Sequence, residues 1–184
     1  MSASASPRRL HLGCGPRAAP GWVNLDLRAA PGVHVRADLR VGLALRPASF
    51  DAAVAIHVLQ DLPYLHVLPS LRQVRAVLRA GGVLRLALPD LDRAIDAYRR
   101  GDRAYFYVPD RDAASAGRKL VAQITWYGSV RTPFTFDCIE ELLGEAGFER
   151  VVRCRFRETR SGDAALIAFD DRERETLFVE AVAP

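Results

Sequence analysis

Residues 10–27 read LHLGCGPRAAPGWVNLDL, two apolar runs separated by a short loop that carries two glycines. The first run, Arg9–Leu12, stops at Gly13 and Gly15, which is typical of a strand that enters a tight turn. The second run, Trp22–Leu27, is rich in aromatic and branched side chains and predicts another strand. Only six or seven residues, from Gly15 to Gly21, are left for the connection to the second run, whereas a crossover with a helix needs about 10–12. We therefore expect the first crossover helix to be short or absent.

Outward from this stretch, strand-like and helix-like segments alternate along the chain. The predicted strands cover residues 33–37, 50–56, 83–88, 151–156 and 177–182, and the predicted helices cover 67–78 and 137–146. The first of these helices is expected to stop at Gly81-Gly82, because glycine commonly follows a helix C-terminus. This alternation predicts an α/β fold with a mostly parallel sheet.

Length and composition indicate a single domain over residues 1–184. The chain is 49% hydrophobic and 26% charged, which is unlike the composition of a disordered chain. No run approaches the ~18 uninterrupted apolar residues of a membrane helix. The first residues, MSASASPRR, lack the apolar core of a secretory leader. We therefore expect a cytoplasmic protein that has no membrane partner.

The three cysteines, Cys14, Cys138 and Cys154, form neither a CxxC pair nor a cluster with histidines. This spacing fits neither a disulfide framework nor a zinc site, so no metal is expected. The formal net charge of +4 invites a nucleic-acid interpretation. However, the arginines are spread along the whole chain, and Lys119 is the only lysine. This pattern is typical of a protein encoded by a GC-rich genome, and it argues against a nucleic-acid-binding surface.

The segment from about residue 98 to residue 135 is the least regular part of the sequence. It is dense in aromatic residues, namely Tyr98, Tyr105, Phe106, Tyr107, Trp126 and Tyr127. Such residues most often pack in a core, and the alternative is a cap on the substrate side of the sheet. The sequence leaves both interpretations open.

Ligands of open α/β sheets bind beyond the carboxyl ends of the strands. A dinucleotide site needs G-x-G-x-x-G, a helix N-terminus facing the pyrophosphate and an acid about 20 residues later. Here the third glycine is missing, and Asp26 follows Gly15 by only 11 residues. NAD, FAD and nucleoside triphosphates are therefore poor candidates, whereas a nucleoside ligand without phosphate is acceptable.

S-adenosylmethionine (SAM) is such a ligand. Gly13 and Gly15 would let the backbone approach its amino-acid end. The carboxylate of Asp26 could accept both ribose hydroxyls, and Asp38 could accept the adenine amine. Two further side chains, Leu27 and Leu39, could sandwich the ring. Alternatively, Asp26 and Asp38 have no ligand-binding role, because acidic residues are common in the turns that follow strands.

Five segments together resemble the class I SAM-dependent methyltransferases, and particularly a small bacterial group that opens with L-x-L-G-C-G and P-G-W-x-N-x-D. They are LHLGCGPRAAPGWVNLDL, FDAAVAIHVLQDL, LRQVRAVLRAGGVLRLALPDL, FTFDCIEELLGEAGFERV and LFVEAVAP. The resemblance implies a Rossmann-like sheet of seven strands with the last strand antiparallel. It also implies that Gly13, Cys14 and Gly15 border the methionine moiety, that Asp26 holds the ribose, and that Asp38 and Leu39 lie at the adenine.

The chain departs from this family where the substrate is expected. Similar proteins often read H-V-L-E-H after the fourth strand, whereas residues 57–61 read HVLQD, and a histidine frequent before the later helix is replaced by the run 131–134. His57 is the best candidate for a general base, because a histidine can titrate near neutral pH. Alternatively, it only lines the cofactor pocket. The other substrate-side candidates are Asp61, Tyr64 and Asp90.

The sequence thus predicts a SAM-dependent methyltransferase with a small-molecule acceptor. A saccharide-type acceptor is suggested by the resemblance alone. Two alternatives remain, a SAM-binding protein without transferase activity and a nucleic-acid methyltransferase. The oligomeric state is left open, since a partner subunit could complete the pocket of so short a chain.

Overall fold

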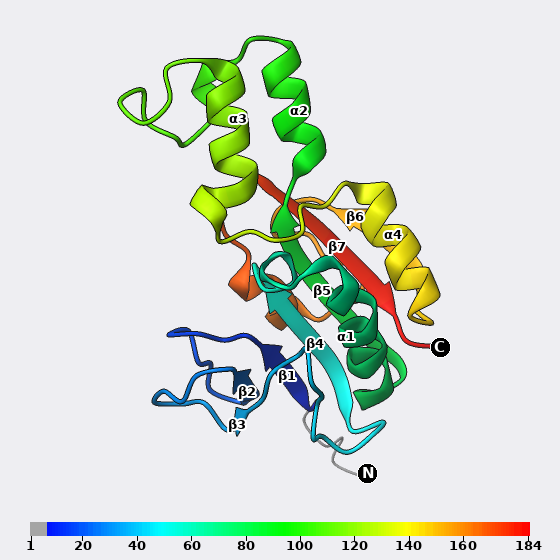
Figure 1. The fold of residues 1–184 in the computed structure, drawn as a ribbon. Helices are drawn as coiled ribbons and strands as arrows, with labels where there is room; N and C mark the ends of the chain where they lie inside the picture. Colours follow the sequence, from blue (N-terminus) through cyan, green and yellow to red (C-terminus); the bar gives the residue numbers. More distant parts are fainter. Residues whose placement is uncertain (1–6) are drawn as a thin grey trace.

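The computed structural model describes residues 7–184. The interpretation of the leader rests mainly on residues 1–6 and lies outside the described residues. Within them, a single seven-stranded sheet forms the centre of the molecule, in the order β3-β2-β1-β4-β5-β7-β6 (Figure 1). The strands are β1 (Arg9–Leu12), β2 (Trp22–Asp26), β3 (Val35–Arg36), β4 (Phe50–Ile56), β5 (Leu78–Pro89), β6 (Glu149–Cys154) and β7 (Thr176–Val182).

The α-helices are α1 (Tyr64–Val77), α2 (Leu91–Arg99), α3 (Ala116–Thr125) and α4 (Phe136–Glu145). Short 3₁₀ helices are η1 (Leu59–Asp61), η2 (Arg103–Tyr105), η3 (Trp126–Gly128) and η4 (Ala164–Phe169). The strands β1 to β5 pair in parallel, and β7 runs antiparallel to both β5 and β6. The α/β class and the antiparallel last strand predicted from the sequence are confirmed.

The connection from β1 to β2 contains no helix, as the loop length predicted. Backbone and side-chain hydrogen bonds hold this loop instead. The amide of Cys14 donates to the carbonyl of Leu25 at 3.1 Å. The Asn24 side chain accepts from the Ala19 amide and donates to the Ala19 carbonyl, both at 3.0 Å. The loop is therefore fixed by strand β2 and needs no helix to support it.

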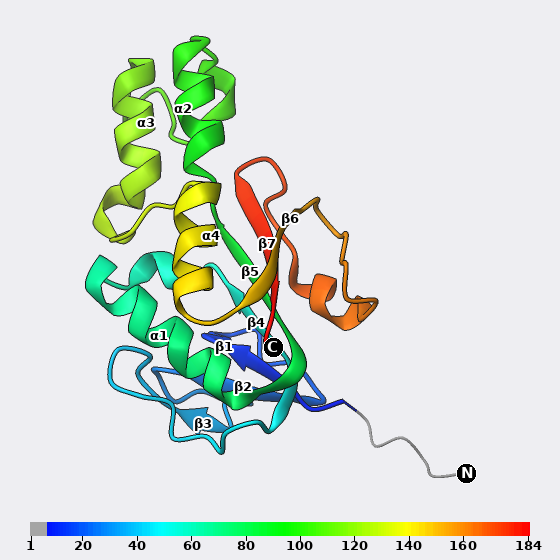
Figure 2. The same ribbon diagram turned by 90° about the vertical axis from the view of Figure 1, so that its right-hand side faces the viewer.

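Each face of the sheet buries alternate residues of the central strands. On β4, Ala53 and Ala55 face the main core, whereas Ala52 and Val54 face a smaller cluster on the opposite side. Helices α1 and α4 cover the first face, and η4 lies on the second (Figure 2). This two-sided burial explains why β4 is almost entirely apolar.

Several predicted element boundaries were wrong, including the strand predicted over 151–156, which is observed at Glu149–Cys154. Helix α1 ends at Val77, and β5 begins at Leu78, so Gly81 and Gly82 lie inside a strand and do not terminate the helix. The reason is tertiary, because Gly81 donates to the Ala183 carbonyl at 2.7 Å and Gly82 accepts from the Ala183 amide at 2.8 Å. The third strand is also shorter than the predicted range 33–37.

Helices α2 and α3 occupy much of the segment that the sequence analysis described as least regular. They stand side by side beyond the carboxyl end of β5 (Figure 1). Side chains cap both, because Asp90 accepts from the Arg93 amide and Ser115 accepts from the Arg118 amide. A small apolar cluster of Ala94, Ala97, Tyr105 and Phe106 packs between them. Some of the aromatic side chains of this segment therefore pack in a hydrophobic core.

Candidate functional site

The strand order reverses between β1 and β4, since the chain continues outward to β2 and β3 on one side and to β5 on the other. Ligands of open α/β sheets bind at such a point. Here Gly13, directly after β1, approaches Val58, the second residue after β4. A Cβ on Gly13 would lie 2.5 Å from Val58 Cγ2, and its φ is +60°. Only glycine lets the two strand ends come this close.

A groove of about 600 Å³ runs along the ends of β1, β2 and β3, and we call it the glycine-loop groove. It is lined by most of the predicted cofactor residues, namely Gly13, Gly15, Asp26, Leu27, Asp38, Leu39 and His57. A Cβ added at Gly15 would meet no atom within 4 Å, so this glycine faces open space. Cys14 does not line the groove, because its side chain is buried beneath the loop.

The Asp26 carboxylate ties the loop to the second strand end. Its Oδ2 accepts from the Gly15 amide at 2.8 Å, and its Oδ1 accepts from the Arg28 amide at 2.9 Å. A carboxylate offers about four lone-pair sites. Asp26 therefore holds the loop in place and still has acceptor capacity for a ligand in the groove.

The Asp38 carboxylate is engaged differently. Arg40 donates to it from Nε at 2.9 Å and from Nη2 at 2.6 Å. This hydrogen bonding lowers the pKa of Asp38 to about 2. Leu39 is buried and Leu27 is half exposed, and both line the groove. An apolar ring could thus contact leucine side chains here, while Asp38 is already partnered by Arg40.

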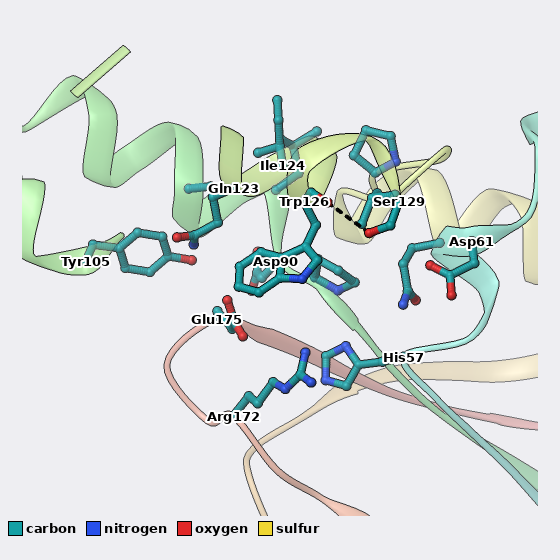
Figure 3. A pocket seen from close by; sticks show the side chains of 16 residues that line it. His57, Asp61, Asp90, Tyr105, Gln123, Ile124, Trp126, Ser129, Arg172 and Glu175 are labelled. Atoms are coloured by element: carbon teal, nitrogen blue, oxygen red, sulfur yellow. Dashed lines mark hydrogen bonds between the residues drawn. The ribbon is translucent and has the colours of Figure 1, made fainter. Parts of the chain in front are cut away.

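A second cavity, of about 230 Å³, adjoins this groove and lies between the ends of β4 and β5, helices α2 and α3, and the segment before β7 (Figure 3). We call it the inner cavity. Three residues, His57, Asp61 and Ser129, line both spaces. The two spaces therefore meet at a shared wall, formed by two residues that follow β4 and by Ser129, which follows η3.

His57 is the central residue of this wall. Its φ is +54°, and its amide donates to the Ala87 carbonyl at 2.8 Å. Its Nε2 lies 3.3 Å from Asp171 Oδ1 and 3.4 Å from Thr176 Oγ1. Burial, with help from the charge of Arg172, lowers the pKa of His57 to about 4. His57 is therefore neutral near pH 7, and the expectation of a near-neutral pKa is wrong.

The three other substrate-side candidates lie in different environments. Asp61 lines both spaces, and desolvation raises its pKa against the opposing charge of Arg131. Asp90 lines the inner cavity but is buried, caps α2 and accepts from Arg153 Nη2 at 2.5 Å. Tyr64 lines neither space and is 58% exposed on α1. Asp61 is the carboxylate best placed to meet a ligand.

The inner cavity also contains residues that the sequence analysis did not assign to a site. They are chiefly Gln60, Tyr105, Gln123, Trp126, Arg172 and Glu175. Tyr105 and Trp126 belong to the aromatic-rich segment, which was a usable signal. The run 170–175, DDRERE, reads as an ordinary solvated surface and gave no signal of its own.

A buried charge network holds the run 170–175 against the sheet. Arg85 on β5 is fully buried and donates to Asp170 at 2.8 and 2.5 Å. It also donates to Glu180 on β7 at 2.8 Å. Breaking such a network leaves buried charges without partners. The positions of Asp171 and Arg172 beside His57 therefore depend on Arg85, and Asp171 also pairs with Arg17 in the loop after β1.

No protein-family model matches the sequence, and no curated protein matches it. The structure is similar to solved SAM-dependent methyltransferases. One, from Thermotoga maritima and described as a possible histamine N-methyltransferase, has a TM-score of 0.61 and 16% identity, covering 98% of this chain and 84% of that chain. Another, from Mesorhizobium loti, has a TM-score of 0.55 and 22% identity, covering 96% and 90%. A third, from Archaeoglobus fulgidus, has a TM-score of 0.60 and 11% identity, covering 96% and 86%.

At these identities the similarity establishes the fold. In the part of the chain that the structure describes, no helix is long and apolar enough to cross a membrane. The chain has the Rossmann-like α/β fold of class I methyltransferases, with its two adjoining spaces at the reversal of the strand order.

Proposed function

We propose that the protein is a SAM-dependent methyltransferase that acts on a small-molecule acceptor. The observation that carries this proposal is the shared wall of His57, Asp61 and Ser129 between the glycine-loop groove and the inner cavity. A methyl group passes directly from donor to acceptor, so both must reach one boundary in line. The fold similarity to proteins described as SAM-dependent methyltransferases supports the same proposal.

SAM would occupy the glycine-loop groove. The open space at Gly15 leaves room for its amino-acid end, and the spare acceptor sites of Asp26 suit two ribose hydroxyls. Leu27 and Leu39 would contact the adenine, with Asp38 at its amine. Cys14 would contribute only backbone. The bound cofactor supplies an electrophilic methyl group, and it requires no helix N-terminus of the kind that a pyrophosphate needs.

The acceptor would occupy the inner cavity, with the segment 98–135 as its cap. A volume of about 230 Å³ suits a small molecule, and a saccharide is one candidate. Because its pKa is about 4, His57 would not act as a strong base. It would instead accept a hydrogen bond from the substrate that receives the methyl group, and so orient that substrate. The same low pKa favours the alternative function, a SAM-binding protein without transferase activity.

The first experiment is calorimetric titration of the protein with SAM and with S-adenosylhomocysteine. We expect micromolar binding to the wild type and a roughly 100-fold loss for Asp26→Ala, because two hydrogen bonds to a charged group disappear. Asp38→Ala should lose less, since Arg40 already occupies that carboxylate. Glu141→Gln, an exposed site on α4, is the matched control. Absence of binding to the wild type would overturn the proposal.

Formation of S-adenosylhomocysteine with an acceptor panel then separates an enzyme from a binding protein. A nucleic-acid acceptor would show binding that weakens steeply with salt. Transfer to a small molecule without such a salt dependence supports the proposed function.

A further inference from the structure

We propose that the methyl acceptor is an aliphatic amine, bound as its ammonium by Gln60 Oε1, Asp61 and His57 Nδ1 at the end of β4. This assignment rests on the proposed function, because it names the substrate class of the same site. All three residues line the inner cavity, and they follow one another within five positions of the chain. Each presents a hydrogen-bond acceptor that the protein itself leaves without a donor.

Gln60 is the most informative of the three. It is 5% exposed, yet its Oε1 has no hydrogen-bond partner among the described residues. Its backbone carbonyl accepts from the amides of Arg131 and Thr132 at 2.8 and 3.0 Å, which fixes the backbone of the residue. A buried acceptor without a donor costs free energy, so native proteins seldom keep one without a reason. A ligand that donates hydrogen bonds in this cavity supplies the reason.

His57 provides a second acceptor. Its Nε2 lies 3.3 Å from Asp171 Oδ1, which has no hydrogen-bond partner among the described residues, and 3.4 Å from Thr176 Oγ1. A hydrogen on Nε2 would face both oxygens, so we assign the tautomer that carries the hydrogen there. The lone pair then lies on Nδ1, which is buried and without a partner in the described part of the chain. Figure 3 shows His57 and Asp61 on one side of the cavity and Tyr105 and Gln123 on the other.

Asp61 provides the third acceptor and the charge. Within residues 7–184 its carboxylate forms no ion pair, although the charge of Arg131 acts on it, and it lines both spaces. An ammonium group offers three N–H donors and a positive charge, and these match one carboxylate and two neutral acceptors. An alkyl hydroxyl offers a single donor and would leave acceptors facing its lone pairs. The acceptor set therefore favours an amine over an alcohol.

The opposite side of the inner cavity is suited to the part of the amine substrate that carries no ammonium group. Tyr105 is 7% exposed, and its hydroxyl has no partner among the residues described. The Gln123 Oε1 already accepts from the Tyr107 amide at 2.8 Å, which leaves its amide group as a donor. Ala94, Ile124 and Pro133 add apolar wall. An amine with a compact apolar body fits this arrangement.

The reaction balances as follows. The bound ammonium loses one proton to Asp61, which passes it to water in the groove. The nitrogen lone pair forms a bond to the methyl carbon, and the carbon–sulfur bond breaks with its electron pair going to sulfur. The products are S-adenosylhomocysteine and a methylated ammonium, which carries the positive charge that the sulfonium had.

The test uses pairs of probes that differ only in the nucleophile, benzylamine with benzyl alcohol and 2-phenylethylamine with 2-phenylethanol. Binding is measured by calorimetry with S-adenosylhomocysteine present, and transfer is measured with SAM. We expect at least one amine to bind and to be methylated while its alcohol is not. Asp61→Asn should weaken amine binding by about 10- to 100-fold when S-adenosylhomocysteine is saturating for both proteins. Glu141→Gln should match the wild type.

The outcomes separate the two proposals. If SAM fails to bind, the proposed function itself fails. If SAM binds and no amine of the panel binds or reacts, or if alcohols react in preference to amines, the amine assignment is overturned while the cofactor assignment stands. Equal amine binding by wild type and Asp61→Asn would also overturn the assignment, because the ammonium would then lie elsewhere.

Discussion

The glycine-loop groove and the inner cavity adjoin each other but are built in different ways. The groove is formed mostly by segments that follow the first four strands, with Ser129 and Arg131 added, and its backbone supplies its shape at Gly13. The inner cavity is formed by side chains from residue 57 to residue 175, and a buried charge network supports one of its walls. We therefore expect the groove, which is shaped by backbone, and the inner cavity, which is shaped by side chains, to respond differently to mutation.

The largest expected effect concerns Arg85. Replacing it, as Arg85→Met, leaves Asp170 and Glu180 as buried carboxylates with one backbone amide each and no cationic partner, and should lower the free energy of unfolding by about 3–5 kcal/mol. Urea denaturation measures this loss. Arg79→Met is the matched control, because its pair with Asp51 is largely exposed and should contribute only about 0–1 kcal/mol.

The same variant also tests the comparison between the two spaces. In the fraction that stays folded, Asp171 and Arg172 should lose their positions. The rate of methyl transfer to the acceptor should therefore fall far more than the affinity for SAM. An equal loss of both would show that the groove depends on the network as much as the inner cavity does.

The next effect is a dependence of stability on pH, because one buried histidine lies at the wall between the two spaces and another lies under the sheet, away from both, against Trp22 and Phe169. Burial lowers the pKa of His11 in β1 and of His57 to about 4 from 6.5. The folded protein then binds fewer protons than the unfolded chain between pH 6.5 and 4. The contribution of the two histidines to the free energy of unfolding is therefore fully present above pH 6.5. It is lost as the pH is lowered, by up to about 3 kcal/mol for each histidine.

Urea denaturation between pH 7.5 and 4.5 measures this slope. His11→Asn and His57→Asn should each remove about half of this pH dependence of the free energy of unfolding. Only His57→Asn should slow methyl transfer to the acceptor. A slope that persists unchanged in both variants would contradict the prediction.

The smallest expected effect distinguishes the two glycines of the loop. Gly13→Ala places a methyl group against Val58, whereas Gly15→Ala places it in open space, and both residues have positive φ. Overpacking should therefore make Gly13→Ala less stable than Gly15→Ala by about 1–3 kcal/mol. Gly15→Ala should mainly reduce SAM affinity. Thermal unfolding and calorimetry measure the two effects, and the reverse ranking would show that the close approach of β1 and β4 is unimportant.

The sequence by itself was sufficient for the α/β class, the missing first crossover helix and the edge of the sheet that carries the groove. These features depend on patterns within short segments, such as the apolar run 50–56 and the short loop after Gly15. Parallel strands bring their carboxyl ends to one edge, so residues that follow each strand are brought together without further information. Gly13, Asp26 and Asp38 were predicted on this basis, and all three line one groove.

Only the tertiary structure decided the inner cavity and the state of its residues. Gly81-Gly82 reads as a helix stop, but pairing with Ala183 places it in a strand. Tyr105, Arg172 and Glu175 come from segments without a local functional pattern, and they meet His57 only because α2, α3 and the run before β7 dock on the sheet. The low pKa of His57 likewise results from burial and from Arg172, which is distant in the chain. Local patterns specify strands and turns, whereas desolvation and long-range contacts depend on how those elements pack.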